Sequence, residues 1–286
     1  MKLITLGTGS PEPYQPRASA SYLIDTGDTR VMFDCGGGAF DRLIQAGYMP
    51  MDLDILCLSH LHSDHMIDYG RLVHARWDKG GHYLDELKVY GPEPMAMISD
   101  KLFGKDGAYA TDLRARCEHP ASQEIYAMRG GQLPRPWPKP EVHEVGSGFT
   151  VTTENGITLT NISVPHCQPW LNSFGWRLDF DGKSVCYSGD SGPSKALNRL
   201  AQGADYFIHM CFQLSQEAMG PEWIRGSSGH LEVARAAQAA GVKNLVISHL
   251  RESMDTDETR ALIEHEVAQI YTGNIIMATD LMCLEW

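Results

Sequence analysis

Short apolar runs alternate along the chain with segments that repeat at the helical period. Runs of about four to eight apolar residues bounded by turn residues are typical of buried strands. In the first part of the chain they predict strands at Met1–Leu6, Ala20–Asp25, Arg30–Asp34, Leu53–Leu58 and Leu87–Tyr90. Helices are predicted at Phe40–Ala46, which Gly47 closes, and at Met66–Trp77.

The second half of the chain returns to the same rhythm. Its apolar runs predict strands at Phe149–Thr153, Ile157–Val164, Ser173–Phe180, Lys183–Tyr187, Asp205–Met210, Asn244–Ser248 and Ile275–Ala278. The helical pattern predicts helices at Ser194–Ala201, Leu231–Ala240 and Thr256–Ile270. Because strands alternate with helices, the pattern favours an α/β fold.

The stretch between the two halves, residues 93–148, is less regular. It offers helical pieces at Met95–Leu102 and Tyr109–Cys117, followed by the segment Leu133–Pro140, whose alternating prolines favour a stiff, extended backbone. This stretch could be a linker between domains, but long loops inside compact domains are often functional. We therefore expect one domain over residues 1–286, with an insertion at about 93–148 that covers the active site.

Tryptophans are candidates for apolar walls around a site. In the insertion, Arg135 and Trp137 could touch the substrate, although Trp137 could equally anchor the loop to the core. The same two roles, pocket wall or core, are open for Trp77, Trp170 and Trp176.

The densest group of potential metal ligands directly follows the predicted strand Leu53–Leu58. His60 and His62 are two residues apart, so in an extended segment their imidazoles point the same way and can bind one ion. Asp64 and His65 come after the chain has turned and can serve a second ion beside the first. A chance gathering in a polar surface loop is the alternative, but the chain has only 12 histidines, which argues against chance.

Three further potential ligands, His166, Asp190 and His249, each follow a predicted strand. Strand ends in an α/β sheet lie along one edge, where ligands bind, so we expect these side chains to converge on the loop at His60. Zinc usually takes four ligands, and a catalytic zinc keeps one position open for water. Asp34 also ends a strand; it could accept a hydrogen bond from a ligand imidazole or merely form the turn before the glycines that follow.

Charge and cysteine content narrow the classes of function. The formal net charge of −12 over 286 residues argues against a broad electrostatic grip on a nucleic-acid backbone, although local basic patches can still occur. Seven cysteines without regular spacing indicate reduced thiols. No apolar run approaches the ~20 residues of a membrane helix, and the first residues run directly into a strand instead of forming a signal peptide. We expect a cytoplasmic protein with no membrane attachment.

Together these motifs resemble the metallo-β-lactamase superfamily, whose signature is His-x-His-x-Asp-His followed by a distant His, Asp and His. Within it the chain is most similar to the ribonuclease Z and arylsulfatase-like branch, through the segments Gly7–Ser10, Phe33–Gly36, Ser59–His65, Tyr187–Asp190 and Ser248–His249. The resemblance covers nearly the whole chain. It implies a four-layer αβ/βα sandwich, in which two mixed sheets pack face to face with helices outside and a dinuclear metal site at one edge.

The resemblance also implies a set of ligands and a metal. One ion would be held by His60, His62 and His166, the other by Asp64, His65 and His249, and Asp190 would bridge them. Zinc suits this imidazole-rich set, although the two carboxylates also admit manganese or iron. Two such ions can share one water and ionise it at neutral pH, so that the bridging hydroxide attacks the substrate.

Two residues are candidates for proton transfer. Asp64, beside the ion and the water, would orient the nucleophile or accept its proton. His230 would protonate the leaving group as a general acid, because it precedes a predicted helix as a nonligand histidine does in the ribonuclease Z branch. The residues after it, Leu231 and Glu232, match that branch only partly, and a polar residue at the entry to a helix is the simpler alternative.

The chain departs from the ribonuclease Z pattern in one region. Enzymes of that branch that process transfer RNA commonly carry a protruding arm between the third ligand histidine and the bridging aspartate, whereas only residues 167–189 separate His166 from Asp190. We therefore expect a small ester substrate, such as a phosphodiester, sulfate ester or lactone, and do not favour a nucleic-acid partner. A transfer-RNA 3′-processing endonuclease is the first alternative. A non-catalytic binding protein is the second, and the complete ligand set argues against it. A homodimer is compatible with the resemblance.

Overall fold

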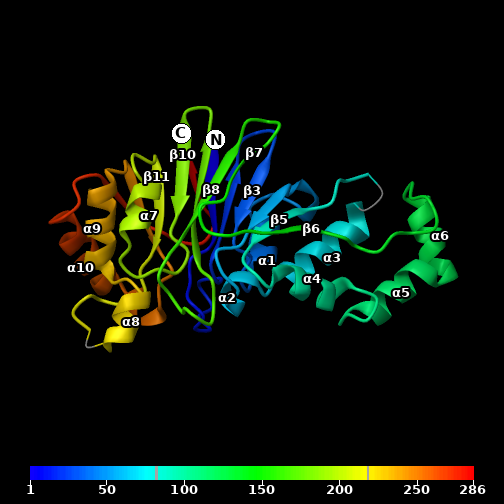
Figure 1. Ribbon diagram of the computed structural model, residues 1–286, viewed down its shortest axis with the longest axis horizontal. Coiled ribbons are helices and arrows are strands. Elements are labelled where there is room, and N and C mark those ends of the chain that lie inside the picture. The colour runs from blue at the N-terminus through cyan, green and yellow to red at the C-terminus, as the bar shows by residue number, and fades with distance from the viewer. Residues whose placement is uncertain (81–82, 218) are drawn as a thin grey trace.

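The computed structural model describes residues 1–80, 83–217 and 219–286. In these residues the chain forms two sheets of seven strands each (Figure 1). The first sheet has the order β14-β1-β2-β3-β4-β5-β6 and the second the order β13-β12-β11-β10-β9-β8-β7. Each sheet pairs strands both parallel and antiparallel, so both are mixed.

The strands of the first sheet are β1 (Lys2–Gly7), β2 (Ser21–Asp25), β3 (Arg30–Phe33), β4 (Ile55–Cys57), β5 (Lys88–Gly91), β6 (Glu141–Glu144) and β14 (Met282–Glu285). Those of the second sheet are β7 (Thr150–Thr152), β8 (Thr158–Ser163), β9 (Phe174–Phe180), β10 (Lys183–Tyr187), β11 (Tyr206–Met210), β12 (Asn244–Ser248) and β13 (Asn274–Met277).

The helices in the first half are α1 (Ala39–Gln45), α2 (Ser63–Met66), α3 (Tyr69–Gly80), α4 (Met95–Phe103), α5 (Ala110–Glu118) and α6 (Pro120–Met128), with a 3-10 turn at Pro50–Asp52. The second half adds α7 (Lys195–Leu200), α8 (Pro221–Gly226), α9 (His230–Ala240) and α10 (Asp257–Ala268), with a 3-10 turn at Glu252–Met254.

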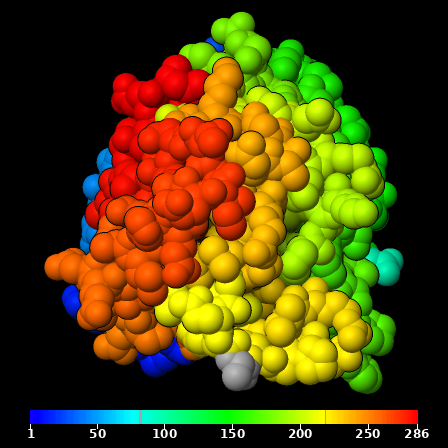
Figure 2. Space-filling view, turned by 90° about the vertical axis from the view of Figure 1, so that its left-hand side faces the viewer, coloured from blue at the N-terminus to red at the C-terminus, as the bar shows by residue number. Residues whose placement is uncertain are grey.

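Three apolar clusters separate the layers of the molecule. The middle cluster, which includes Tyr22, Phe33 and Trp176, lies between the two sheets. A second cluster joins the first sheet to α1, α3, α4 and α5, and a third joins the second sheet to α7, α9 and α10. The order helix, sheet, sheet, helix confirms the expected four-layer sandwich. Figure 2 shows the outer face of the second half, with the orange C-terminal helices above yellow residues along the lower edge.

Hydrogen bonds between the two sheets bring their loops together at one edge. The Trp176 indole N–H in β9 donates to the Leu58 carbonyl beyond β4 at 3.0 Å. The Phe174 amide donates to the carbonyl of Ser59 at 2.9 Å. The Tyr22 hydroxyl in β2 also lies 2.7 Å from the Ser248 hydroxyl in β12. These contacts hold the loop that leaves β4 against β9, and the end of β12 against β2.

The fold differs from the expected elements mainly at its edges. The edge strands β6 and β14, the helix α6 and the short helices α2 and α8 were not predicted, and the helix expected at Met66–Trp77 is broken into α2 and α3. Residues 93–148 contain α4, α5, α6 and the edge strand β6, and Figure 1 shows α5 and α6 at the opposite end of the molecule from α8. Among the described residues, no helix is long and apolar enough to cross a membrane.

Candidate metal centre

The loop after β4 presents its four potential ligands from two kinds of backbone. His62 is extended (φ −66°, ψ 148°) and lies immediately before the first turn of α2, in which Asp64 and His65 sit. The His65 amide donates to the His62 carbonyl at 3.0 Å, which closes this turn. The expected change of direction between His62 and Asp64 is therefore a single helical turn.

The three distant ligands arrive from the second sheet. His166 follows β8, Asp190 follows β10 and His249 follows β12. Before Asp190, Gly189 has φ 56°, and a Cβ there would lie 2.6 Å from the carbonyl oxygen of Phe174, so only glycine fits this turn. His249 itself adopts φ 63°, an unusual backbone for a residue with a side chain. Such strain is common where a side chain must be aimed precisely.

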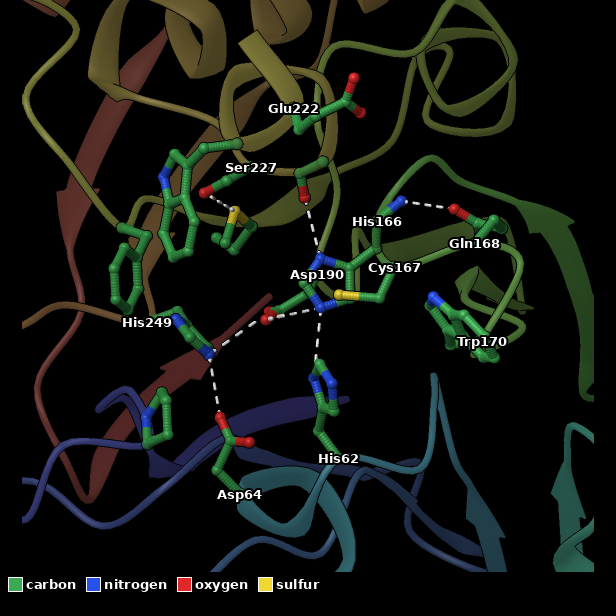
Figure 3. Close-up of a pocket in the computed structure, with 15 residues that line it drawn as sticks. His62, Asp64, His166, Cys167, Gln168, Trp170, Asp190, Glu222, Ser227 and His249 are labelled. Atoms are coloured by element: carbon green, nitrogen blue, oxygen red, sulfur yellow. Dashed lines mark hydrogen bonds and ion pairs between the residues drawn. The ribbon is translucent and has the colours of Figure 1, made fainter. Parts of the chain in front are cut away.

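The structure brings all seven predicted ligands together (Figure 3). The potential ligand atoms form two groups, each within 4.8 Å; the first contains His60, His62, His166 and Asp190, and the second Asp64, His65 and His249. Asp190 lies between the groups: its Oδ2 is 3.7 Å from His166 Nε2, and its Oδ1 is 3.3 Å from His249 Nε2. This is the place that the resemblance assigns to a bridging carboxylate.

Hydrogen bonds outside the group set the tautomers of three histidines. His65 Nδ1 donates to Asp34 Oδ2 at 2.7 Å, and His166 Nδ1 donates to the Gly226 carbonyl at 2.9 Å. His60 Nδ1 lies 3.0 Å from the Ser59 hydroxyl, which itself donates to Asp34 at 2.6 Å. Because each Nδ1 carries the proton, each Nε2 keeps its lone pair for an ion, the arrangement common among metal-binding histidines.

Asp34 therefore accepts a hydrogen bond from a ligand imidazole, which is one of the two roles that the sequence left open. Its side chain is completely buried and accepts hydrogen bonds from His65, from the Ser59 amide and hydroxyl, and from the Tyr187 hydroxyl at 2.8 Å. A residue of the first sheet thus positions a ligand with help from a tyrosine of the second.

Several buried polar side-chain atoms in the group lack a hydrogen-bonding partner, although the large majority of such atoms in proteins have one. They are Asp64 Oδ2, His65 Nε2, Asp190 Oδ1 and both ring nitrogens of His249. Acceptor atoms that face one another without donors fit a cation. The chemistry of this donor set, imidazole and carboxylate, suits divalent metal ions.

The charges of the group also fit a cation. Burial alone would raise the pKa of Asp190, but His249 and His65 hold it well below its usual range. Burial would likewise raise the pKa of Asp64, but the neighbouring His249 and His65, each within 3.4 Å of Oδ2, lower it. Burial lowers the pKa of His60 well below its usual value, and the neighbouring His65 adds to this effect. Ionised carboxylates and a neutral imidazole are the forms that bind metals.

A cavity of about 420 Å³ opens over the ligands. Besides ligand side chains, its lining includes Pro11, Cys167, Gln168, Trp170, Met210, Phe212, Glu222, Trp223, Gly226 and Ser227. None of these described lining residues belongs to 93–148, so the cover expected from the insertion has no support in the lining and stays a prediction. Arg135 instead packs over the ring of Trp77 (3.8 Å) and pairs with Asp78, while Trp137 packs against the core of the first sheet.

His230 lies outside the lining of the cavity. Its ring is fully buried at the start of α9; Nδ1 accepts from the Ser215 amide at 3.2 Å, and Nε2 donates to Glu266 at 2.6 Å. With both nitrogens occupied by protein partners, the ring holds the loop after β11 against α9 and α10. A role as general acid for His230 stays a prediction.

One wall of the cavity is formed by Phe212 and Trp223, which were not predicted from the sequence as site residues. Phe212 lies two residues beyond β11, and Trp223 is in α8, a helix too short to produce a recognisable period. The available signal was positional: Phe212 follows the strand Asp205–Met210, as the ligands follow theirs. Among the tryptophans that the sequence allowed as either pocket wall or core, Trp77 and Trp176 are core residues, and Trp170 lines the cavity.

Comparisons with known proteins agree with this geometry. The family model of the metallo-beta-lactamase superfamily matches residues 14–202. The chain is 31% identical over 297 residues to the Ribonuclease Z of Mycobacterium marinum, an alignment that covers 100% of this chain and 98% of that protein. The solved structure of the metallo-beta-lactamase fold protein YhfI from Bacillus subtilis has a TM-score of 0.73 at 21% identity, with 100% of this chain and 99% of that chain covered. Human tRNase Z, short form, has a TM-score of 0.71 at 18% identity over the same shares.

These two structures support the fold alone. The family model and the Mycobacterium marinum relative also show the family to which the chain belongs. The expected family is confirmed, and the relatives favour the ribonuclease alternative over the small ester. The chain therefore belongs to the metallo-β-lactamase superfamily and is a metal-dependent hydrolase.

Proposed function

We propose that the protein hydrolyses phosphodiester bonds with two divalent metal ions, zinc being the preferred one. The observation that carries this proposal is the position of Asp190, whose two carboxylate oxygens face different ligand groups at 3.3 and 3.7 Å. His60, His62 and His166 would hold one ion, Asp64, His65 and His249 the other. Two such ions, when bound, supply an activated water and polarise the oxygens of a phosphoryl group.

The residues of the chain have separate tasks in this reaction. Asp64 lines the cavity and has a carboxylate oxygen without a hydrogen-bond donor, so it can accept a proton from the attacking water. Asp34, Ser59 and the Gly226 carbonyl keep three imidazoles in the tautomer that binds ions. The apolar wall of the cavity excludes bulk water from one side of the reacting group.

RNA is the substrate we propose first, with cleavage of the ribonuclease Z type. Its support is the similarity to the Mycobacterium marinum Ribonuclease Z, which covers 100% of this chain and 98% of that protein. The net charge of −12 does not prevent this, because the ligand set itself would carry positive charge once loaded with ions.

A small phosphodiester is the second candidate, and the lining of the cavity favours it. No lysine or arginine is among the described residues of this lining, and Glu222 adds a carboxylate. Residues 167–189 contain the strands β9 and β10, so little chain is left there for a protruding arm.

Three measurements test the proposal. Metal analysis of the purified protein should find close to two ions per chain, and hydrolysis of bis(p-nitrophenyl) phosphate should disappear in Asp64→Asn. Cleavage of a precursor transfer RNA at its 3′ side would support the first substrate. Activity on the small diester without cleavage of the RNA would support the second, and failure on both would sink the proposed function.

A further inference from the structure

The wall of the cavity next to His249 is built from aromatic rings. The ring centroid of Phe212 lies 6.0 Å from that of His249, and the centroid of Trp223 lies 5.2 Å from that of Phe212. Phe212 and Trp223 both line the cavity together with Met210. An apolar surface therefore leads from a metal ligand toward the mouth.

Trp223 is held in place although it is 41% exposed. Its indole N–H donates to Gln213 Oε1 at 2.9 Å, and Gln213 is itself buried, with its Oε1 also accepting from the Ser227 hydroxyl at 3.0 Å. Phe212 is supported by the Arg251 guanidinium, 5.1 Å from its ring centroid, which pairs with Glu217 at 2.7 Å. Both rings are thus oriented before a ligand arrives, which lowers the entropic penalty of binding.

An exposed tryptophan in a fixed orientation is a surface suited to stacking. An indole that served only the core would be buried, as Trp176 is at 0% exposure. On the other side of the ligands the cavity is lined by Trp170, which is 88% exposed; Figure 3 shows Trp170 and His249 on opposite sides of Asp190. A flat group attached to the reacting phosphate would meet an aromatic wall.

The charges of the lining point in the same direction. Among its described residues no lysine or arginine offers a site for a second phosphate, and Glu222 would repel one. The part of the substrate beyond the reacting phosphate must therefore be recognised through its shape and its π-face rather than its charge. Stacking on aromatic side chains does this for nucleobases and other flat rings.

We propose that Phe212 and Trp223 form a subsite that stacks a flat aromatic ring carried by one of the two groups joined to the reacting phosphate. The ring would be a nucleobase in an RNA substrate or an aryl group in a small diester. This assignment rests on the proposed function for its phosphate, and Gln213 acts as a positioning residue that fixes the indole.

The test measures binding instead of turnover. Metal-loaded protein is titrated by calorimetry with two matched pairs of monoesters, adenosine 5′-monophosphate against ribose 5-phosphate, and phenyl phosphate against methyl phosphate. Within each pair the phosphate is shared, and only one member carries a ring. We expect the ring to improve the dissociation constant about ten- to a hundredfold in at least one pair.

Variants assign this preference to the wall. Trp223→Ala should reduce the ratio within the pair to near one, whereas Trp223→Phe should retain most of it. Ile224→Ala is the matched control, because Ile224 is the next residue of α8, is 47% exposed and does not line the cavity. Melting curves of all variants establish that each is folded.

The outcomes separate the subsite from the proposed function. A ratio near one in both pairs of the unmodified protein, or an equal ratio in Trp223→Ala, overturns the subsite. A preference confined to phenyl phosphate identifies an aryl ring, and a preference for the nucleotide identifies a nucleobase. If the preference is present but no phosphodiester is cleaved, the proposed function fails while the subsite stands.

Discussion

Asp34 and His65 join through a hydrogen bond of 2.7 Å between Oδ2 and Nδ1, and neither side chain is exposed to solvent. Asp34 directly follows the strand β3, and His65 lies in the short helix α2, so the bond ties the end of this strand to the loop that carries the ligands. The backbone of Asp34 has φ 57°; its amide donates to the Cys57 carbonyl at 2.9 Å, and its carbonyl accepts from the Ser21 hydroxyl at 2.9 Å. The aim of the His65 imidazole thus depends on a residue that cannot itself reach an ion bound by His65 Nε2.

Asp34→Asn should weaken metal binding without removing a ligand. The amide cannot accept all the bonds that the carboxylate accepts, and a neutral partner no longer increases the basicity of the imidazole. Changes of this kind typically reduce metal affinity or activity about 10- to 100-fold, which a chelator competition titration would measure. His143→Ala, at a half-exposed histidine in the edge strand β6, is the control. Unchanged affinity in Asp34→Asn would contradict the role.

Gly226→Ala should displace His166. A Cβ at position 226 would lie 2.4 Å from the carbonyl oxygen of His166, and the Gly226 carbonyl is the acceptor for His166 Nδ1. The backbone must move to relieve the clash, so we expect lost metal and a lowered melting temperature. Gly220→Ala is the matched control, because nothing lies within 4 Å of a Cβ there. Equal metal content in both variants would show that the contact can relax without consequence.

Removal of metal should destabilise the fold. Without ions, Asp64, Asp190 and His249 keep buried atoms that no hydrogen bond satisfies. An ion present at a hundred times its dissociation constant adds about 2.7 kcal/mol to the free energy of unfolding, so a chelator should lower the melting temperature by several degrees. Returning zinc should restore it. In Asp190→Ala the chelator should have a smaller effect, and an equal effect would mean that the ions bind elsewhere.

The sequence predicted the parts of the structure that depend on local pattern. The buried strands, from Lys2–Gly7 to Asn244–Ser248, are apolar runs, and all seven ligands follow strands or lie in one loop. The edge strands β6 and β14 were not predicted. Apolar and polar residues alternate too weakly in their sequences, Glu-Val-His-Glu and Met-Cys-Leu-Glu, to identify a half-exposed strand. Pairing with a neighbour, which no local pattern records, makes them strands.

Part of the site could not be predicted from local sequence patterns either, because it also depends on contacts between separate elements. Trp223 and Gln213 gain their roles from a hydrogen bond between a six-residue helix and a loop. The general-acid hypothesis for His230 relied on its place before a helix, and that place is correct, since His230 begins α9. The position along the chain does not say which way the ring points, and the ring turns toward Glu266.

His230 can be tested by the choice of leaving group. A general acid matters little when the leaving group is an acidic phenol and greatly when it is an alcohol. Because both ring nitrogens are occupied by Ser215 and Glu266, we expect His230→Gln to lower kcat by a similar factor for aryl and alkyl diesters. A loss that is at least tenfold greater for the alkyl diester would confirm the prediction that His230 is the general acid.

His209, which is not one of the predicted metal ligands, gives a prediction about pH. Burial lowers the pKa of His209 to about 4, although the hydrogen bond to the Met210 carbonyl opposes this effect. The unfolded chain, with a histidine pKa near 6.5, takes up the proton first as the pH falls. The stability that the neutral ring contributes is therefore complete above pH 6.5 and decreases toward pH 4.

The comparison of wild type with His209→Gln isolates this contribution, because glutamine can still donate to the Met210 carbonyl and does not titrate. Between pH 7 and pH 5 the difference in unfolding free energy between the two proteins should shrink by about 2 kcal/mol, measured by urea denaturation at each pH. The other histidines titrate in both proteins and cancel. A difference that stays constant over this range would mean that the His209 ring takes up its proton in the folded state as easily as in the unfolded chain.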